Sequence, residues 1–271
     1  MAKNIGYSDL ILISKDILVN IQQLIEHGAD KIELLMDGPK WNDMEDIFPE
    51  LKQQLKTFPV SYTIHPPAWD INLTSENRSI RDASFNEYKK AIEFAHMIEA
   101  DHVVIHPGFC FSPHFDKKIA QQRALNYINE LCQIAKKLNI KLAIENVGYH
   151  GTSIFTQDEY THFLVNVDDT AGYLIDTGHA HLNNWDIPQL IKDTKDRLLA
   201  LHLHDNNKSG DDHLPIGAGT IAWNKVFSAI HTYAPQCQLI LEYATTTPLE
   251  KLQEGKNILL QNNLGVQNDS N

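Results

Sequence analysis

The feature of this sequence that most restricts its fold is a repeated alternation of short apolar segments with longer amphipathic ones. Each apolar segment has the length of a buried strand, and each amphipathic segment has the apolar spacing of a helix. Strands and helices that alternate in this way form parallel β-α-β units. The predicted strands cover residues 5–7, 31–36, 60–64, 102–105, 141–144, 173–175, 198–203 and 238–241. Eight units without a low-complexity linker predict a single α/β domain over residues 1–271, a (β/α)8 TIM barrel.

The helices between these strands are marked by apolar periodicity and by capping residues. Gly28 follows the first helix as a C-terminal cap, and Thr156 and Glu159 have the spacing of a capping box. The predicted helices cover residues 15–27, 46–56, 79–99 and 117–138, stretches that begin at 156 and near 187, residues 223–233, and a last stretch that ends near 261.

Side chains that commonly bind metal ions follow six of the eight predicted strands. They are His65, His106, Glu145, Asp176, His202 and Glu242, and three more candidates, His179, Asp211 and His213, lie in the loops after two of these strands. The carboxyl ends of the strands form one rim of a TIM barrel, and that rim carries the active site in enzymes of this fold. The sequence therefore predicts that all nine side chains lie at one rim.

Each of these residues, taken alone, also has a structural interpretation. A histidine before a proline, such as His65 or His106, is often a turn or core residue, and a single glutamate often pairs with a lysine or arginine. Four carboxylates in one pocket repel one another unless cations balance them. Near this rim the sequence offers few cations besides Lys40, Lys208 and the histidines. A divalent metal ion therefore explains the group best, and mixed imidazole and carboxylate ligands favour zinc, manganese or a similar ion.

Strand alternation supports an inward direction for several candidates. His202 and His204 share one face of their strand, and Glu145 shares a face with Ala143, whereas the large apolar residues between them point outward. His181 and His204 are neighbours of ligand candidates, so we expect them to support the ligands from behind.

Charge and cysteine content restrict the partners. Lys and Arg total 23 and Asp and Glu 35, so the formal charge is −12, which disfavours nucleic acid except at a local basic groove. Three scattered cysteines suit neither a disulfide framework nor a thiolate metal site, and they indicate reduced thiols. The sequence shows no signal peptide and no apolar run of membrane-spanning length, so we expect a cytoplasmic location. Nothing in the sequence specifies the oligomeric state.

In several motifs the sequence resembles the xylose-isomerase-like TIM-barrel superfamily, which includes sugar-phosphate isomerases and epimerases and endonuclease IV (AP endonuclease family 2). The motifs are His106-Pro107-Gly108, Ile144-Glu145-Asn146, Asp176-Thr177-Gly178-His179, His202-Leu203-His204-Asp205, His213-Leu214-Pro215-Ile216-Gly217-Ala218-Gly219 and Leu241-Glu242. For the isomerases and epimerases, the resemblance implies one metal ion held by Glu145, Asp176, His202 and Glu242. The two glutamates would also move protons on opposite faces of the substrate carbon. For endonuclease IV, the resemblance implies three zinc ions held by all nine candidates.

The departures from endonuclease IV lie in the loops that contact DNA. Where that family has a probing arginine after the second strand, this chain has Lys40 and Trp41, and the loop after the third strand carries Trp69 instead of a tyrosine and leucine wedge. Between Asp211 and His213 the arginine of that family is replaced by Asp212. The recognition loops are therefore closer to those of an enzyme that acts on a small molecule.

The sequence favours a divalent-metal-dependent isomerase or epimerase of a sugar or sugar phosphate, with one to three zinc or manganese ions per chain. Glu145 and Glu242 are the expected catalytic residues, because each can carry a proton. The expected substrate contacts are His179, His213, Trp69, Lys40 and His204. Two alternatives remain, an endonuclease IV-like phosphodiesterase with several zinc ions and a non-catalytic protein that binds sugar or metal.

Overall fold

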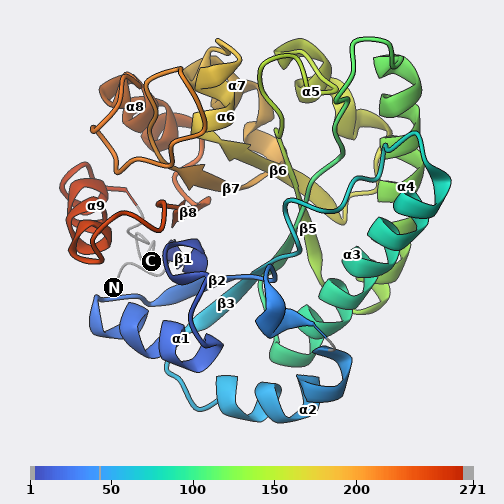
Figure 1. The fold of residues 1–271 in the computed structure, drawn as a ribbon. Helices are drawn as coiled ribbons and strands as arrows, with labels where there is room; N and C mark the ends of the chain where they lie inside the picture. The colour runs from blue at the N-terminus through green and yellow to red at the C-terminus, as the bar shows by residue number, and fades with distance from the viewer. Residues whose placement is uncertain (1–3, 43, 265–271) are drawn as a thin grey trace. The chain divides into compact units, whose positions relative to one another are not determined.

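The computed structural model describes residues 4–42 and 44–264. Its eight strands are parallel, pair in chain order and close into a barrel (Figure 1). The strands are β1 (Ile5–Ser8), β2 (Lys31–Leu35), β3 (Ser61–His65), β4 (His102–Ile105), β5 (Lys141–Glu145), β6 (Ala171–Asp176), β7 (Leu198–Leu203) and β8 (Gln238–Leu241). The prediction of a (β/α)8 TIM barrel is confirmed.

The helices follow the predicted pattern, with one addition. They are α1 (Ile17–Glu26), α2 (Met44–Leu55), α3 (Arg78–Ile98), α4 (Lys117–Lys137), α5 (Gln157–Phe163), α6 (Thr177–Leu182), α7 (Ile187–Thr194), α8 (Trp223–Tyr233) and α9 (Glu250–Gln261). Helix α1 begins two residues later than predicted because the Asp16 side chain accepts from the backbone of Leu18 and caps it. Helix α6 is too short to show a helical period in the sequence.

Contacts divide the chain into two compact units. The first comprises residues 1–34, 59–61 and 175–271, and the second comprises residues 35–58 and 62–174. In the first unit β8 pairs with both β1 and β7, so that Leu241 lies beside Tyr7 and Leu203. In the second unit β5 pairs with β4 and β6, so that Ile144 lies beside Ile105 and Tyr173. The single domain over residues 1–271 stays a prediction.

Buried tyrosines tie helices of the second unit to the ends of its strands. The Tyr88 hydroxyl of α3 accepts from the backbone N–H of His106 and donates to its carbonyl, both at 3.2 Å. The Tyr160 hydroxyl of α5 lies 2.7 Å from the backbone oxygens of Ile144 and Leu174. These bonds hold the chain where β4 and β5 open into the polar residues that follow. In the described part of the chain, no helix is both long and apolar enough to cross a membrane.

Candidate metal centre

The second unit brings together three of the predicted ligands, His65, His106 and Glu145, which we call the His65 set. Strands β3 and β5 end at His65 and Glu145, and His106 directly follows β4. All three side chains are buried. The Nε2 atoms of His106 and His65 lie 3.0 and 3.6 Å from the same Glu145 oxygen, Oε2. Two imidazoles therefore face one carboxylate oxygen.

The protonation of His65 follows from its other nitrogen. Its Nδ1 lies 2.7 Å from the carbonyl oxygen of Pro66, which can only accept, so Nδ1 carries the proton. With the proton on Nδ1, a neutral ring would present a lone pair at Nε2 toward the Glu145 carboxylate, and a proton or a metal ion between the two atoms would bind both. Two ligand atoms that each lie about 2.1 Å from one ion, at a tetrahedral angle, are about 3.4 Å apart. The distances of the His65 set are therefore compatible with metal ligands.

The first unit contains a second group of the same kind, His179, Asp211 and His213, which we call the Asp211 set. The Nε2 atoms of His179 and His213 each lie 3.2 Å from Asp211 Oδ2. The Nδ1 of His213 bonds the backbone oxygen of Glu242 at 3.1 Å, which directs Nε2 at the carboxylate. The second carboxylate oxygen, Asp211 Oδ1, is buried and has no hydrogen-bond partner among the described residues. An acceptor left in this state fits a metal ligand.

The electrostatics of the Asp211 set favour a cation at its centre. Burial by itself would raise the pKa of Asp211 and lower the pKa of His213. The nearby His179 and His213 rings nevertheless hold the pKa of the Asp211 carboxyl well below its usual range. Hydrogen bonding to Asp211 and the charge of Glu242 raise the pKa of His213 to about 9. A divalent ion would take the place of the proton on His213 Nε2 and bind the Nε2 atoms of both His179 and His213.

A third group in the first unit comprises Glu33, His202 and Glu242, which we call the His202 set. His202 Nδ1 lies 3.3 Å from Glu242 Oε2, and His202 Nε2 lies 3.0 Å from Glu33 Oε1. Asp176 Oδ2 is 3.9 Å from the same Nδ1. All of these side chains are buried. One imidazole therefore has carboxylates on both of its nitrogens, the pattern in which an outer carboxylate orients a metal-binding histidine.

Glu33 is the member of this group that the sequence does not single out. It stands in the middle of β2, between the apolar residues Ile32 and Leu34. Alternation places Glu33 on the same face of the strand as Lys31. Two charged residues on one face of an otherwise apolar strand are a sequence signal for a buried polar contact. Its partner His202 lies far away in the sequence, so the pairing needs the structure.

The remaining predicted site residues take different positions. Trp69 is 64% exposed in the loop after β3, and Lys40 is half-buried in a 3-10 turn after β2. Their roles as substrate contacts stay predictions. His204 is fully buried in the first unit, with its Nε2 2.8 Å from Asp176 Oδ2.

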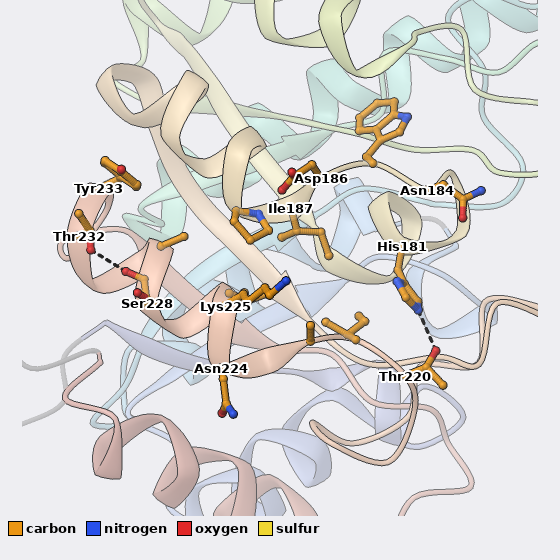
Figure 2. A pocket seen from close by; sticks show the side chains of 16 residues that line it. His181, Asn184, Asp186, Ile187, Thr220, Asn224, Lys225, Ser228, Thr232 and Tyr233 are labelled. Atoms are coloured by element: carbon orange, nitrogen blue, oxygen red, sulfur yellow. Dashed lines mark hydrogen bonds between the residues drawn. The ribbon is translucent and has the colours of Figure 1, made fainter.

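His181 faces a pocket of the first unit rather than a carboxylate. Its Nε2 bonds the Thr220 hydroxyl at 2.9 Å (Figure 2). The pocket lies between α7 and α8 and has a volume of about 870 Å³. Burial, with the charge of Lys208, lowers the pKa of His181. The bond to a hydroxyl indicates a structural role at the pocket edge.

The fold agrees with the family to which the chain belongs. Residues 21–261 match the family described as xylose isomerase-like TIM barrel, so the resemblance predicted from the motifs is confirmed. An uncharacterized protein of Methanocaldococcus jannaschii is 29% identical over 221 residues, which cover 81% of this chain and 84% of the relative. A protein of Halothermothrix orenii named probable endonuclease 4 is 25% identical over 257 residues, covering 86% of this chain and 91% of the relative.

Solved structures with the same fold include sugar epimerases. A D-tagatose 3-epimerase-like protein superposes with a TM-score of 0.82 at 22% identity, covering 96% of each chain. A protein described as the IOLI protein with a binding zinc atom superposes with a TM-score of 0.80 at 16% identity, covering 96% of this chain and 97% of that chain. The chain thus shares its fold with sugar epimerases, and identity this low to the solved structures shows the fold alone.

Proposed function

We propose that this protein is a divalent-metal-dependent enzyme that isomerises or epimerises a sugar or sugar phosphate. The observation that carries the proposal is the His202 set, in which the imidazole lies 3.3 Å from a glutamate placed directly after a strand of the barrel. Glu242 can hold an ion with one oxygen and accept a proton with the other. The fold shared with sugar epimerases supports this reading of the site.

The motifs shared with isomerases and epimerases imply Glu145, Asp176, His202 and Glu242 as the ligands of the catalytic ion, and the first unit holds the last three of them. A bound divalent ion would polarise the carbonyl and the neighbouring hydroxyl of the sugar. Glu242 or Glu145 then removes the proton from the carbon beside the carbonyl, and the electron pair of that bond passes toward the carbonyl oxygen. The other glutamate returns a proton to the opposite face, which inverts the carbon. Both carboxyls are buried, which keeps bulk water away from the proton in transfer.

A second function, phosphodiester hydrolysis by several metal ions, is favoured by one specific observation. The His65 set and the Asp211 set each direct two imidazoles at one carboxylate oxygen, at distances between 3.0 and 3.6 Å. One catalytic ion does not need these extra ligands, whereas each further ion needs its own. The number of ions bound therefore separates the two functions.

The test begins with metal content and exchange chemistry. We expect the purified protein to bind one divalent transition metal ion tightly, and chelation to lower its melting temperature. Incubated in D2O with a panel of ketoses, aldoses and their phosphates, the loaded protein should exchange the proton beside the carbonyl of one compound, as followed by NMR.

Glu242→Gln should slow this exchange by about 10²–10⁴-fold, as expected for loss of a proton carrier. The exposed Glu250→Gln, at the start of α9, is the matched control and should be unchanged. Failure to bind any such metal would contradict both functions. Three bound ions, together with cleavage of a DNA duplex at an abasic site, would replace the epimerase with the nuclease.

A further inference from the structure

His204 stands among the ligand candidates of the first unit in surroundings built closely around its ring. Its side chain is fully buried. The Thr177 hydroxyl bonds both the N–H and the carbonyl of His204, at 3.2 and 2.9 Å. Gly178 lies against the ring, and a Cβ added there would come within 2.0 Å of His204 Cε1. A residue with any side chain at 178 would therefore displace this ring.

One edge of the ring contacts a predicted metal ligand. His204 Nε2 lies 2.8 Å from Asp176 Oδ2, and an ionised carboxylate can only accept, so Nε2 carries the proton and donates it. The other Asp176 oxygen accepts from the backbone N–H of His179 at 2.6 Å. Both oxygens are thus held at defined positions, which fixes the direction of their remaining lone pairs.

The face of the ring contacts the Asp211 set. The rings of His204 and His213 are stacked, with centroids 3.9 Å apart and planes inclined by 9°. The His179 ring meets His204 edge-on, with centroids 6.3 Å apart at 89°. A buried ring packed on His213 limits the rotation of that imidazole. His204 thus contacts Asp176 through the edge of its ring and the Asp211 set through the face of its ring.

We propose that His204 is a positioning residue, which orients Asp176 through its Nε2–H and His213 through its stacked ring. The proposal rests on the metal-binding function proposed above. In metal sites, a group that orients a ligand through a hydrogen bond typically contributes about 10–100-fold to metal affinity. The two contacts use separate features of His204, so substitutions can separate them.

Two variants of His204 and one control make the test. His204→Gln keeps an N–H donor near the position of Nε2 but loses the ring, and His204→Phe keeps a stacked ring but loses the donor. His231→Phe changes an exposed histidine of α8 and should behave as the unchanged protein. We expect His204→Phe, which loses the donor to Asp176, to weaken zinc binding by about 10–100-fold in competition with a chromogenic chelator. His204→Gln, which loses only the stacked ring, should weaken it by a smaller factor.

NMR of the metal-free protein gives readouts that do not depend on activity or on bound metal. Long-range ¹H–¹⁵N spectra should place a proton on Nε2 of His204, with the signal assigned by its loss in His204→Phe. The ring protons of His213 should lose their upfield ring-current shift in His204→Gln and keep it in His204→Phe.

The outcomes distinguish this proposal from the function on which it rests. Equal weakening of zinc binding in both variants would make His204 a ligand and overturn the positioning role, and unchanged binding in His204→Phe would also overturn it. If the protein binds no divalent transition metal at all, the proposed function fails. The tautomer still tests the contact between His204 and Asp176, because an Nε2 of His204 without a proton refutes it.

Discussion

Removing the charge of Asp205 should loosen the loop that carries two of the candidate ligands. The Asp205 side chain is fully buried and accepts four hydrogen bonds. Its Oδ1 accepts from the backbone of Asn206 at 2.9 Å and of Ile221 at 3.1 Å. Its Oδ2 accepts from the backbone of Gly217 at 3.1 Å and from the Trp223 indole at 2.7 Å. One carboxylate thus connects the end of β7 to the far end of the loop and to α8.

The magnitude follows from these four contacts. Asp205→Asn replaces one carboxylate oxygen by an NH2 group. The two N–H donors that bonded that oxygen then face a group that cannot accept. Each unsatisfied buried donor costs about 1–3 kcal/mol, so the free energy of unfolding should fall by about 2–6 kcal/mol. Trp223→Phe removes one donor and leaves the carboxylate with three, so it should cost about 1.5–3 kcal/mol. Asp212→Asn changes a half-buried acid of the same loop and should stay within about 0.5 kcal/mol.

The assay is urea unfolding of metal-free protein, followed by circular dichroism, because metal bound by Asp211 or His213 would add its own stabilisation. Hydrogen exchange at the amides of Gly217 and Ile221 reports the loop itself and should accelerate in Asp205→Asn. An Asp205→Asn protein within about 1 kcal/mol of the unchanged one, with both amides as protected as before, would refute the reasoning.

Three further predictions concern residues outside the ligand sets. Burial lowers the pKa of Lys31 to about 8, so below that pH the folded protein carries the charged lysine at a desolvation cost, and between pH 8 and 10.5 only the unfolded chain binds the proton. Relative to Lys31→Met, the protein should therefore gain about 3 kcal/mol of unfolding free energy between pH 7 and 10.5, measured by urea unfolding; a pH-independent difference would contradict this. Gly108→Ala should lower the melting temperature, because φ is +133° and the new Cβ would lie 2.3 Å from Thr74 Oγ1, and Thr74→Ala should restore only the part due to contact with Oγ1 and Cγ2. Thr156→Ala removes the N-cap of α5 and should cost about 1 kcal/mol in urea unfolding, and no loss would mean that the cap is redundant.

The sequence predicts the barrel well because each strand is defined by apolar residues that end at a polar one. Strands β4, β7 and β8 have the predicted bounds. Strand β6 begins two residues earlier than predicted, at Ala171, because Ala171 and Gly172 carry no clear apolar signal and join the strand through pairing with β5. Pairing between distant segments is a tertiary effect that a local pattern does not contain.

The sequence indicates which residues are candidates for the site, but it does not indicate which of their side chains contact one another. The His65 set brings together three residues from the ends of three different strands, as expected if the residues that follow the strands lie at one rim of the barrel. The sequence cannot separate His181 from His204, since both are histidines next to ligand candidates. Only the structure shows that one bonds Thr220 and the other Asp176. Glu33 was missed because its role depends on His202, which is not near it in the chain.

The construction of these sets argues for metal ligands rather than structural ion pairs. A lysine or arginine would neutralise a buried carboxylate with a single side chain, whereas Glu145 and Asp211 each face two imidazoles through one oxygen. Protonating both rings would place two positive charges side by side, with the His65 and His106 centroids only 4.9 Å apart, and like charges this close oppose each other. One proton can therefore form a hydrogen bond to the carboxylate oxygen from at most one ring of each pair. A divalent ion would bind both nitrogens and the oxygen at once, and the backbone acceptor at Nδ1 of His65 leaves its Nε2 free to face such an ion.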